Sequence, residues 1–132
     1  MEKRSRRFLA IGLVFIGSFL LAEAALAHHG TAAYDATKQL TVRATVTAFE
    51  WANPHCELRF DVKDGRGNVQ HWTVEAINPL MLGRYGWTRT SLKPGDMVTV
   101  TFRPAKNGEM IGILEKVVLP DGRELPGRQL YN

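Results

Sequence analysis

The sequence predicts an all-β domain with one short helix, and three observations indicate this class. Five segments carry the apolar patterns of strands, mostly as alternation of apolar and polar residues. Turn signals rich in glycine, proline and asparagine separate the segments. One short helical segment follows the third strand. The predicted order is three strands, a helix and two strands, which is the order of an OB-like five-stranded Greek-key barrel. A small β-sandwich is the alternative.

The first two strands flank a turn signal at Asn53-Pro54. From Lys38 to Ala48, leucine, valine and alanine alternate with threonine and arginine, as expected of a half-buried strand. Apolar residues then occupy the second face at Phe49 and Trp51, so we expect a twist or a bulge there. In the second strand the inner face carries four residues, and His55 begins the outer face. These four are Cys56, Leu58, Phe60 and Val62.

The remaining elements follow from turn and cap signals. Asp64-Gly65-Arg66-Gly67 predicts a hairpin into a third strand, in which Trp72, Val74 and Ala76 point inward. A helix over 80–85 follows, with Asn78 as its N-cap, Pro79 at its first position and Gly86 at its end. The last two strands cover 97–103 and 110–119.

The first 27 residues have the three parts of a secretory signal. A basic start precedes an apolar run from Phe8 to Ala22, and Ala25-Leu26-Ala27 forms the cleavage triplet. The run is shorter than the roughly 20 residues that a membrane-spanning helix needs, so we expect no membrane span after cleavage. The expected location is the periplasm. Ser5-Arg6-Arg7-Phe8-Leu9 partly matches a twin-arginine signal, so both export routes stay open.

Cleavage after Ala27 leaves 105 of the 132 residues, which suits one small domain. Residues 28–37 are expected to be a flexible lead-in, 38–123 the barrel domain and 124–132 a loosely attached tail. Removing the leader also reduces the net charge from +4 to +2. Because so small a charge does not indicate a nucleic-acid footprint, we expect no nucleic-acid partner.

Cleavage would also place two histidines at the amino terminus. The amino group and ring of His28 can chelate a transition metal, or the amino group, the next amide and His29 can bind Cu(II) together. His55 is the natural third donor. Glu75, expected opposite or nearly opposite His55 on the same face, would orient its ring. The alternatives are a solvated tail and a strand-end histidine that is bonded to the nearby backbone.

Two other candidate ligands are less suitable. His71 should face Asp61 or Arg59 across the hairpin, too far from His55 to share a metal ion. Cys56 should be a small buried residue, because adjacent strand residues point to opposite faces. No serine nucleophile elbow is present, so we expect a binding protein and not an enzyme.

Several motifs together resemble an uncharacterised family of small exported bacterial proteins, known only as a domain of unknown function. The motifs are His28-His29, Trp51-Ala52-Asn53-Pro54-His55, Gly86-Trp87-Thr88, Ser91-Leu92-Lys93-Pro94-Gly95-Asp96 and Leu119-Pro120-Asp121-Gly122-Arg123. The chain departs from the family at Gly30, where Ser is usual, and at Cys56, where an aliphatic residue is usual. The resemblance implies no known activity, but it implies that His28, His29 and His55 belong to one pattern.

Two functions are consistent with these observations. In the first, the protein binds copper or another transition metal through His28, His29 and His55, with Glu75 behind His55. In the second, it is a metal-independent structural or interaction module of the cell envelope. Its sheet face would then contact a protein or a small polar ligand through Glu57, Arg59, Thr73 and Glu75.

Overall fold

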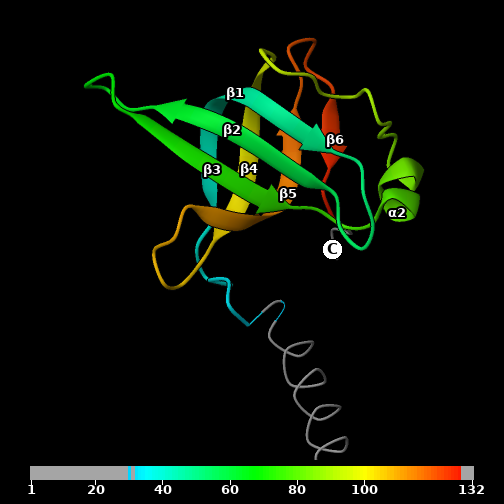
Figure 1. Cartoon of the computed structure of the whole chain (residues 1–132), viewed down its shortest axis with the longest axis horizontal. Helices are drawn as coiled ribbons and strands as arrows, with labels where there is room; N and C mark the ends of the chain where they lie inside the picture. Colours follow the sequence, from blue (N-terminus) through cyan, green and yellow to red (C-terminus); the bar gives the residue numbers. More distant parts are fainter. Residues whose placement is uncertain (1–29, 31, 129–132) are drawn as a thin grey trace, which may run out of the picture. The chain divides into compact units, whose positions relative to one another are not determined.

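The structure is a computed structural model that describes residue 30 and residues 32–128. The predicted signal, His28 and His29 lie outside these residues. The elements, in chain order, are β1 (Leu40–Glu50), β2 (Glu57–Lys63), β3 (Val69–Glu75), α2 (Pro79–Arg84), β4 (Met97–Pro104), β5 (Ile111–Val118) and β6 (Glu124–Pro126), as Figure 1 shows.

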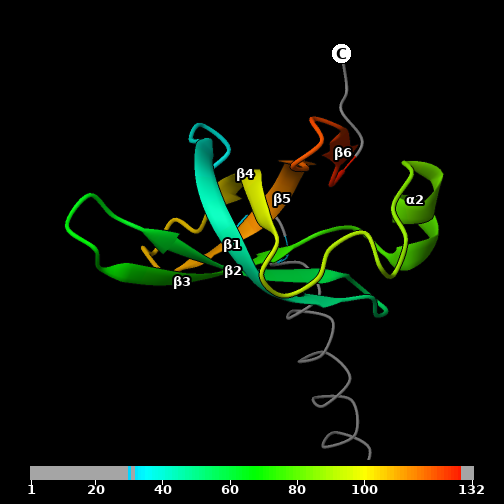
Figure 2. The same cartoon turned by 90° about the horizontal axis from the view of Figure 1, so that it is seen from above.

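The strands form one sheet that closes on itself. Its order is β3-β2-β1-β4-β5-β6, and an additional parallel pairing joins β3 to β5. The long strand β1 makes this possible, because its first half pairs with β4 and its second half with β2. Seen from above, β1 crosses between the two halves of the barrel (Figure 2). The OB-like five-stranded barrel is therefore confirmed, and the chain does not adopt the β-sandwich alternative.

Inward-facing side chains fill the barrel. Phe102 lies at its centre, with ring centroids 5.7 Å from Phe60 and 4.8 Å from Trp72. At one end Trp87 packs on Phe49, with a centroid distance of 5.3 Å. The predicted inner face of the second strand is confirmed at Cys56, Leu58 and Phe60, all fully buried, while Val62 is half-buried. The expected bulge in the first strand is also present, between Val46 and Ala48.

The helix follows its predicted start. Asn78 has an extended backbone, and its side-chain oxygen accepts a hydrogen bond of 3.0 Å from the backbone N–H of Met81. Pro79 occupies the first helical position, where no backbone donor is needed. Gly86 follows the helix with φ of 88°, a conformation that side chains other than glycine rarely adopt.

The carboxyl-terminal segment differs from the expected loose tail. Residues 124–126 form β6, which pairs antiparallel with β5. Leu125 is buried, and the indole N–H of Trp87 donates a 2.7 Å hydrogen bond to the carbonyl of Pro126. Gly127 continues the pairing by donating to the carbonyl of Glu115 at 2.7 Å. These residues therefore belong to the barrel.

Residues 34–37, which were expected to belong to a flexible lead-in, are also attached to the barrel. Tyr34 forms an isolated bridge with Ala105, and the backbone N–H of Asp35 donates to the carbonyl of Pro104 at 2.9 Å. The Asp35 carboxylate accepts hydrogen bonds from the backbone and the hydroxyl of Thr37. We call residues 34–38 the anchor turn, since they fasten the lead-in to the end of β4.

Candidate functional site

His55 lies in the connection between β1 and β2, directly after the cis peptide bond Asn53–Pro54. The strand ladder extends one residue before β2, because the backbone N–H of Cys56 donates to the carbonyl of Ile77 at 3.2 Å. His55 precedes this last pair, and its side chain is exposed. Within residues 32–128 the imidazole makes no hydrogen bond or ion pair. Both ring nitrogens are therefore accessible in the described part of the chain.

The other described histidine has a partner. His71 pairs with Asp61 across the hairpin, and its Nδ1 lies 2.6 Å from the carboxylate. The pairing with Asp61 is one of the two predicted arrangements. The turn decides between them, because Asp64 and Asn68 close a loop centred on Arg66. This register confirms that His71 and His55 are far apart along the strand.

The same register places Glu75 directly opposite Glu57. His55 lies two residues before Glu57 in the chain, beyond the last paired residues of β2 and β3. No hydrogen bond joins the two side chains among those that the structure describes, so the orienting role of Glu75 stays a prediction.

Three glutamates form a row at this end of the sheet. Glu50 pairs with Glu57, and Glu57 pairs with Glu75, so the row crosses β1, β2 and β3. The guanidinium of Arg59 lies 3.0 Å from Glu50 and 2.7 Å from Glu57 and offsets part of their negative charge. Within residues 32–128, no group of three or more histidine, cysteine, aspartate or glutamate side chains could hold a metal ion.

Cys56 has the inward position that alternation predicts. The residue is fully buried in the core cluster. Burial raises the pKa of its thiol above the ordinary value of 9.0, and a hydrogen bond with the Ala52 backbone opposes this shift. A buried thiol with a raised pKa is a poor metal ligand.

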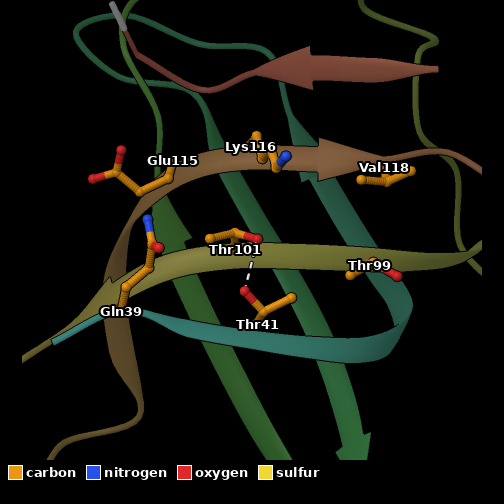
Figure 3. Close-up of a pocket in the computed structure, with 7 residues that line it drawn as sticks. All are labelled: Gln39, Thr41, Thr99, Thr101, Glu115, Lys116 and Val118. Atoms are coloured by element: carbon orange, nitrogen blue, oxygen red, sulfur yellow. Dashed lines mark hydrogen bonds between the residues drawn. The ribbon is translucent and has the colours of Figure 1, made fainter. Parts of the chain in front are cut away.

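A groove lined largely by threonines, which the sequence reasoning missed, lies on the outer face of β1, β4 and β5. Its volume is about 480 Å³. The hydroxyls of Thr41 and Thr101, which face each other in the register, are 3.0 Å apart at its centre (Figure 3). The groove is lined by Gln39, Thr41, Thr99, Thr101, Glu115, Lys116 and Val118. The outward threonines of the first and fourth strands are the sequence signal that could have indicated it.

Glu115 marks one end of this groove. Its carboxylate is buried and lies 2.7 Å from Arg103 Nε and 3.3 Å from Arg128 Nη1. In Figure 3 the carboxylate points away from the pair of Thr41 and Thr101. The charge of Glu115 therefore fastens the carboxyl-terminal segment to the barrel and is not directed into the groove.

Comparison with solved structures gives one similar protein that bears on the expected partners. It is a mitochondrial single-stranded DNA-binding protein of S. cerevisiae, Rim1, at 10% sequence identity and a TM-score of 0.49. The match covers 70% of this chain and 98% of that chain. From the sequence we expected no nucleic-acid partner, and this finding corrects that expectation. The likeness does not assign a ligand to this chain, and the OB-like fold follows from the strand order itself.

The remaining comparisons concern the sequence and the membrane. No curated protein matches the chain. In the described part of the chain, no helix has the length and apolar character needed to cross a membrane. A model of a family of unknown function, DUF6152, matches residues 18–115, which include the segment of His28 and His29 as well as His55. The chain therefore belongs to the DUF6152 family of unknown function.

Proposed function

We propose that the protein is an exported β-barrel that binds copper, as Cu(II), through an amino-terminal arm and His55. The arm is residues 28–33, between the predicted cleavage site and the anchor turn. The exposed imidazole of His55, without a partner in residues 32–128, is the observation that supports this most. The described barrel has no complete metal site of its own, so the other donors would come from the arm.

The arm carries the donor types that copper prefers. The amino group and ring of His28 would bind one ion, and His29 and His55 would add imidazole nitrogens. Glu75, which pairs with Glu57 at the end of β3, would orient the ring of His55. Since the proposal needs no nucleophile or general base, it is a proposal of binding and not of catalysis. We expect the protein in the periplasm, because the amino terminus of the arm forms only when the signal is removed.

The arm precedes the anchor turn, which is attached to the barrel at Pro104 and Ala105. The six residues of the arm extend about 20 Å at most. Burial, and secondarily the negative charge of Glu75, raise the pKa of Tyr34, so the root of the arm lies within the electrostatic influence of Glu75. Glu75 pairs with Glu57, which lies two residues after His55 in the chain.

Competitive titration of the mature protein, residues 28–132, with Cu(II) tests the proposal. His55→Ala should weaken binding about tenfold or more, since a lost ligand corresponds to at least about 1.4 kcal/mol. The matched control is His71→Ala, an outward histidine whose ring is held by Asp61. The control should stay within about twofold of wild type. Equal affinities of wild type and His55→Ala would overturn the proposal.

A metal-independent interaction module is the second candidate function. The β2–β3 hairpin extends beyond the rest of the barrel in both views (Figures 1 and 2). The contacts of Arg59 with Glu50 and Glu57 order the charged outer face of this hairpin before any partner binds. A partner captured equally by wild type and by the mature His28→Ala variant, in the presence of chelator, would favour this function.

A further inference from the structure

We propose that the fork between β1 and β2 binds an extended acidic peptide of a partner protein, which adds as a strand to the free edge of β1. The fork is the opening beside Thr41 and Arg43 of β1 and Lys63 of β2, where β1 leaves β2 to pair with β4 alone. All its residues belong to the described barrel, and neither the arm nor His55 contributes to it. The inference therefore goes beyond the proposed function and does not depend on it.

The fork follows from the two ladders that β1 makes. The ladder between β1 and β2 begins at the pair of Thr45 and Asp61. Before Thr45, β1 pairs with β4, and in Figure 2 this half of β1 runs away from the β2–β3 hairpin. A continued register would place Arg43 opposite Lys63, but the ladder does not extend to them. The two strands have therefore separated at this point.

The free edge of β1 carries main-chain groups that point into the fork. The backbone N–H of Val46 donates to the carbonyl of Asp96 at 2.9 Å, so the main-chain groups of Val46 are directed to the β4 side. Because these groups alternate between the two edges of a strand, those of Thr41 and Arg43 are directed to the β2 side. No strand within residues 32–128 pairs with them there.

The facing edge of β2 is free in the same way. The N–H of Asp64 donates to the carbonyl of Asn68 at 2.9 Å, so the main-chain groups of Asp64 are directed to the β3 side. Those of the preceding Lys63 are then directed into the fork. The fork thus presents both donors and acceptors of hydrogen bonds. An added strand uses both kinds, whereas a small anion would use only the donors, and this favours a peptide.

The charges beside the edge indicate the chemistry of that peptide. Arg43 and Lys63 line a pocket of about 340 Å³, and both are exposed. Neither side chain makes a hydrogen bond or an ion pair in the described part of the chain. The remaining lining residues are Ala44, Thr45, Asp61 and Met97. Since Asp61 is the one acidic residue among them, the lining has a net positive charge, which favours acidic side chains on the added strand.

NMR spectroscopy of the mature protein tests the proposal, with a short peptide in which threonine and glutamate alternate as the probe. The amides of Thr41 and Arg43 should shift, and they should exchange more slowly with solvent when the peptide is bound. N-methylation of the glutamates or of the threonines blocks one edge of the peptide or the other. At least one of the two methylated peptides should bind about tenfold more weakly, because it loses main-chain hydrogen bonds.

Charge variants test the roles of Arg43 and Lys63. Arg43→Glu and Lys63→Glu should each weaken binding about threefold or more, because reversal replaces an attraction with a repulsion. Asp61→Asn should strengthen binding, since it removes the acidic charge from the lining and keeps a partner for His71. Lys106→Glu is the matched control, because Lys106 is an exposed lysine in the turn after β4, outside the fork. The control should bind the peptide as wild type does.

Four outcomes would overturn the proposal. The first is the absence of peptide-induced shifts at Thr41 and Arg43. The second is equal binding of the parent peptide and both methylated peptides, which would mean that the peptide binds only as a polyanion. The third is an equal affinity of wild type and both reversal variants. The fourth is a free protein that is dimeric in size-exclusion chromatography with these two amides already protected, since a second copy would then occupy the edge.

Discussion

At the scale of single residues, the neighbour of each histidine decides what its ring can do. Nδ1 of His71 is hydrogen-bonded to the carboxylate of Asp61, whereas His55 has no partner among the described residues. Alternation along the strands predicts that both rings point outward, but it does not predict which ring is paired. The pairing depends on the hairpin register, which the carboxylate of Asp64 fixes by accepting from the backbones of Arg66 and Asn68.

The turn aspartates lead to a prediction on acid stability. Hydrogen bonds from the side chain of Asn68 and from the backbones of Arg66 and Asn68 lower the pKa of Asp64 below its ordinary 3.8. A folded-state pKa below the unfolded value stabilises the fold above the unfolded pKa, and this contribution is lost as the pH falls through the folded pKa. We therefore expect the free energy of unfolding to decrease between about pH 5 and pH 2.

Urea unfolding of wild type and Asp64→Asn at several pH values measures this effect. The variant should lose less stability than wild type on acidification, because asparagine keeps the turn oxygen and does not titrate. The pKa values of three other turn aspartates are also lowered: Asp35, Asp96 and Asp121. The variant should therefore still lose part of its stability on acidification. Identical pH profiles of the two proteins would contradict the assignment to Asp64.

At the scale of elements, the sequence predicts the strands and the helix that have a clear local sequence pattern. The five main strands, the helix with its Asn78 cap and the bulge in β1 all have local signals, and all are confirmed within one to three residues. The anchor turn and β6 have no such pattern. A strand of three residues with one apolar side chain, Leu125, does not differ in sequence from a polar tail, and its partners in β5 are found only in the folded chain.

The burial of Leu125 makes the role of β6 testable. Leu125→Ala should lower the free energy of unfolding by about 2–4 kcal/mol, since it removes a buried side chain and leaves a cavity in the core. Leu80→Ala is the matched control, because Leu80 on α2 is 70% exposed. We expect the control to change the stability by less than about 0.5 kcal/mol in urea unfolding. Equal effects of the two variants would show that residues 124–126 are not part of the core.

At the scale of the whole molecule, the OB-like barrel does not determine function, because one fold supports many sites. Family membership also leaves the activity open. The candidate site could be predicted only in part. His55 and Glu75 follow from strand alternation, whereas the fastening of the lead-in at Tyr34 and Asp35 depends on contacts with the distant end of β4.

The central claim is that cleavage creates a copper-binding arm that begins with His28. Native mass spectrometry of the protein, exported by its own signal and purified without chelator, tests this most directly. After addition of one equivalent of Cu(II), the account predicts a chain that begins at His28 and carries one copper ion. A chain that begins at another residue, or a chain that begins at His28 and retains no copper, would contradict it.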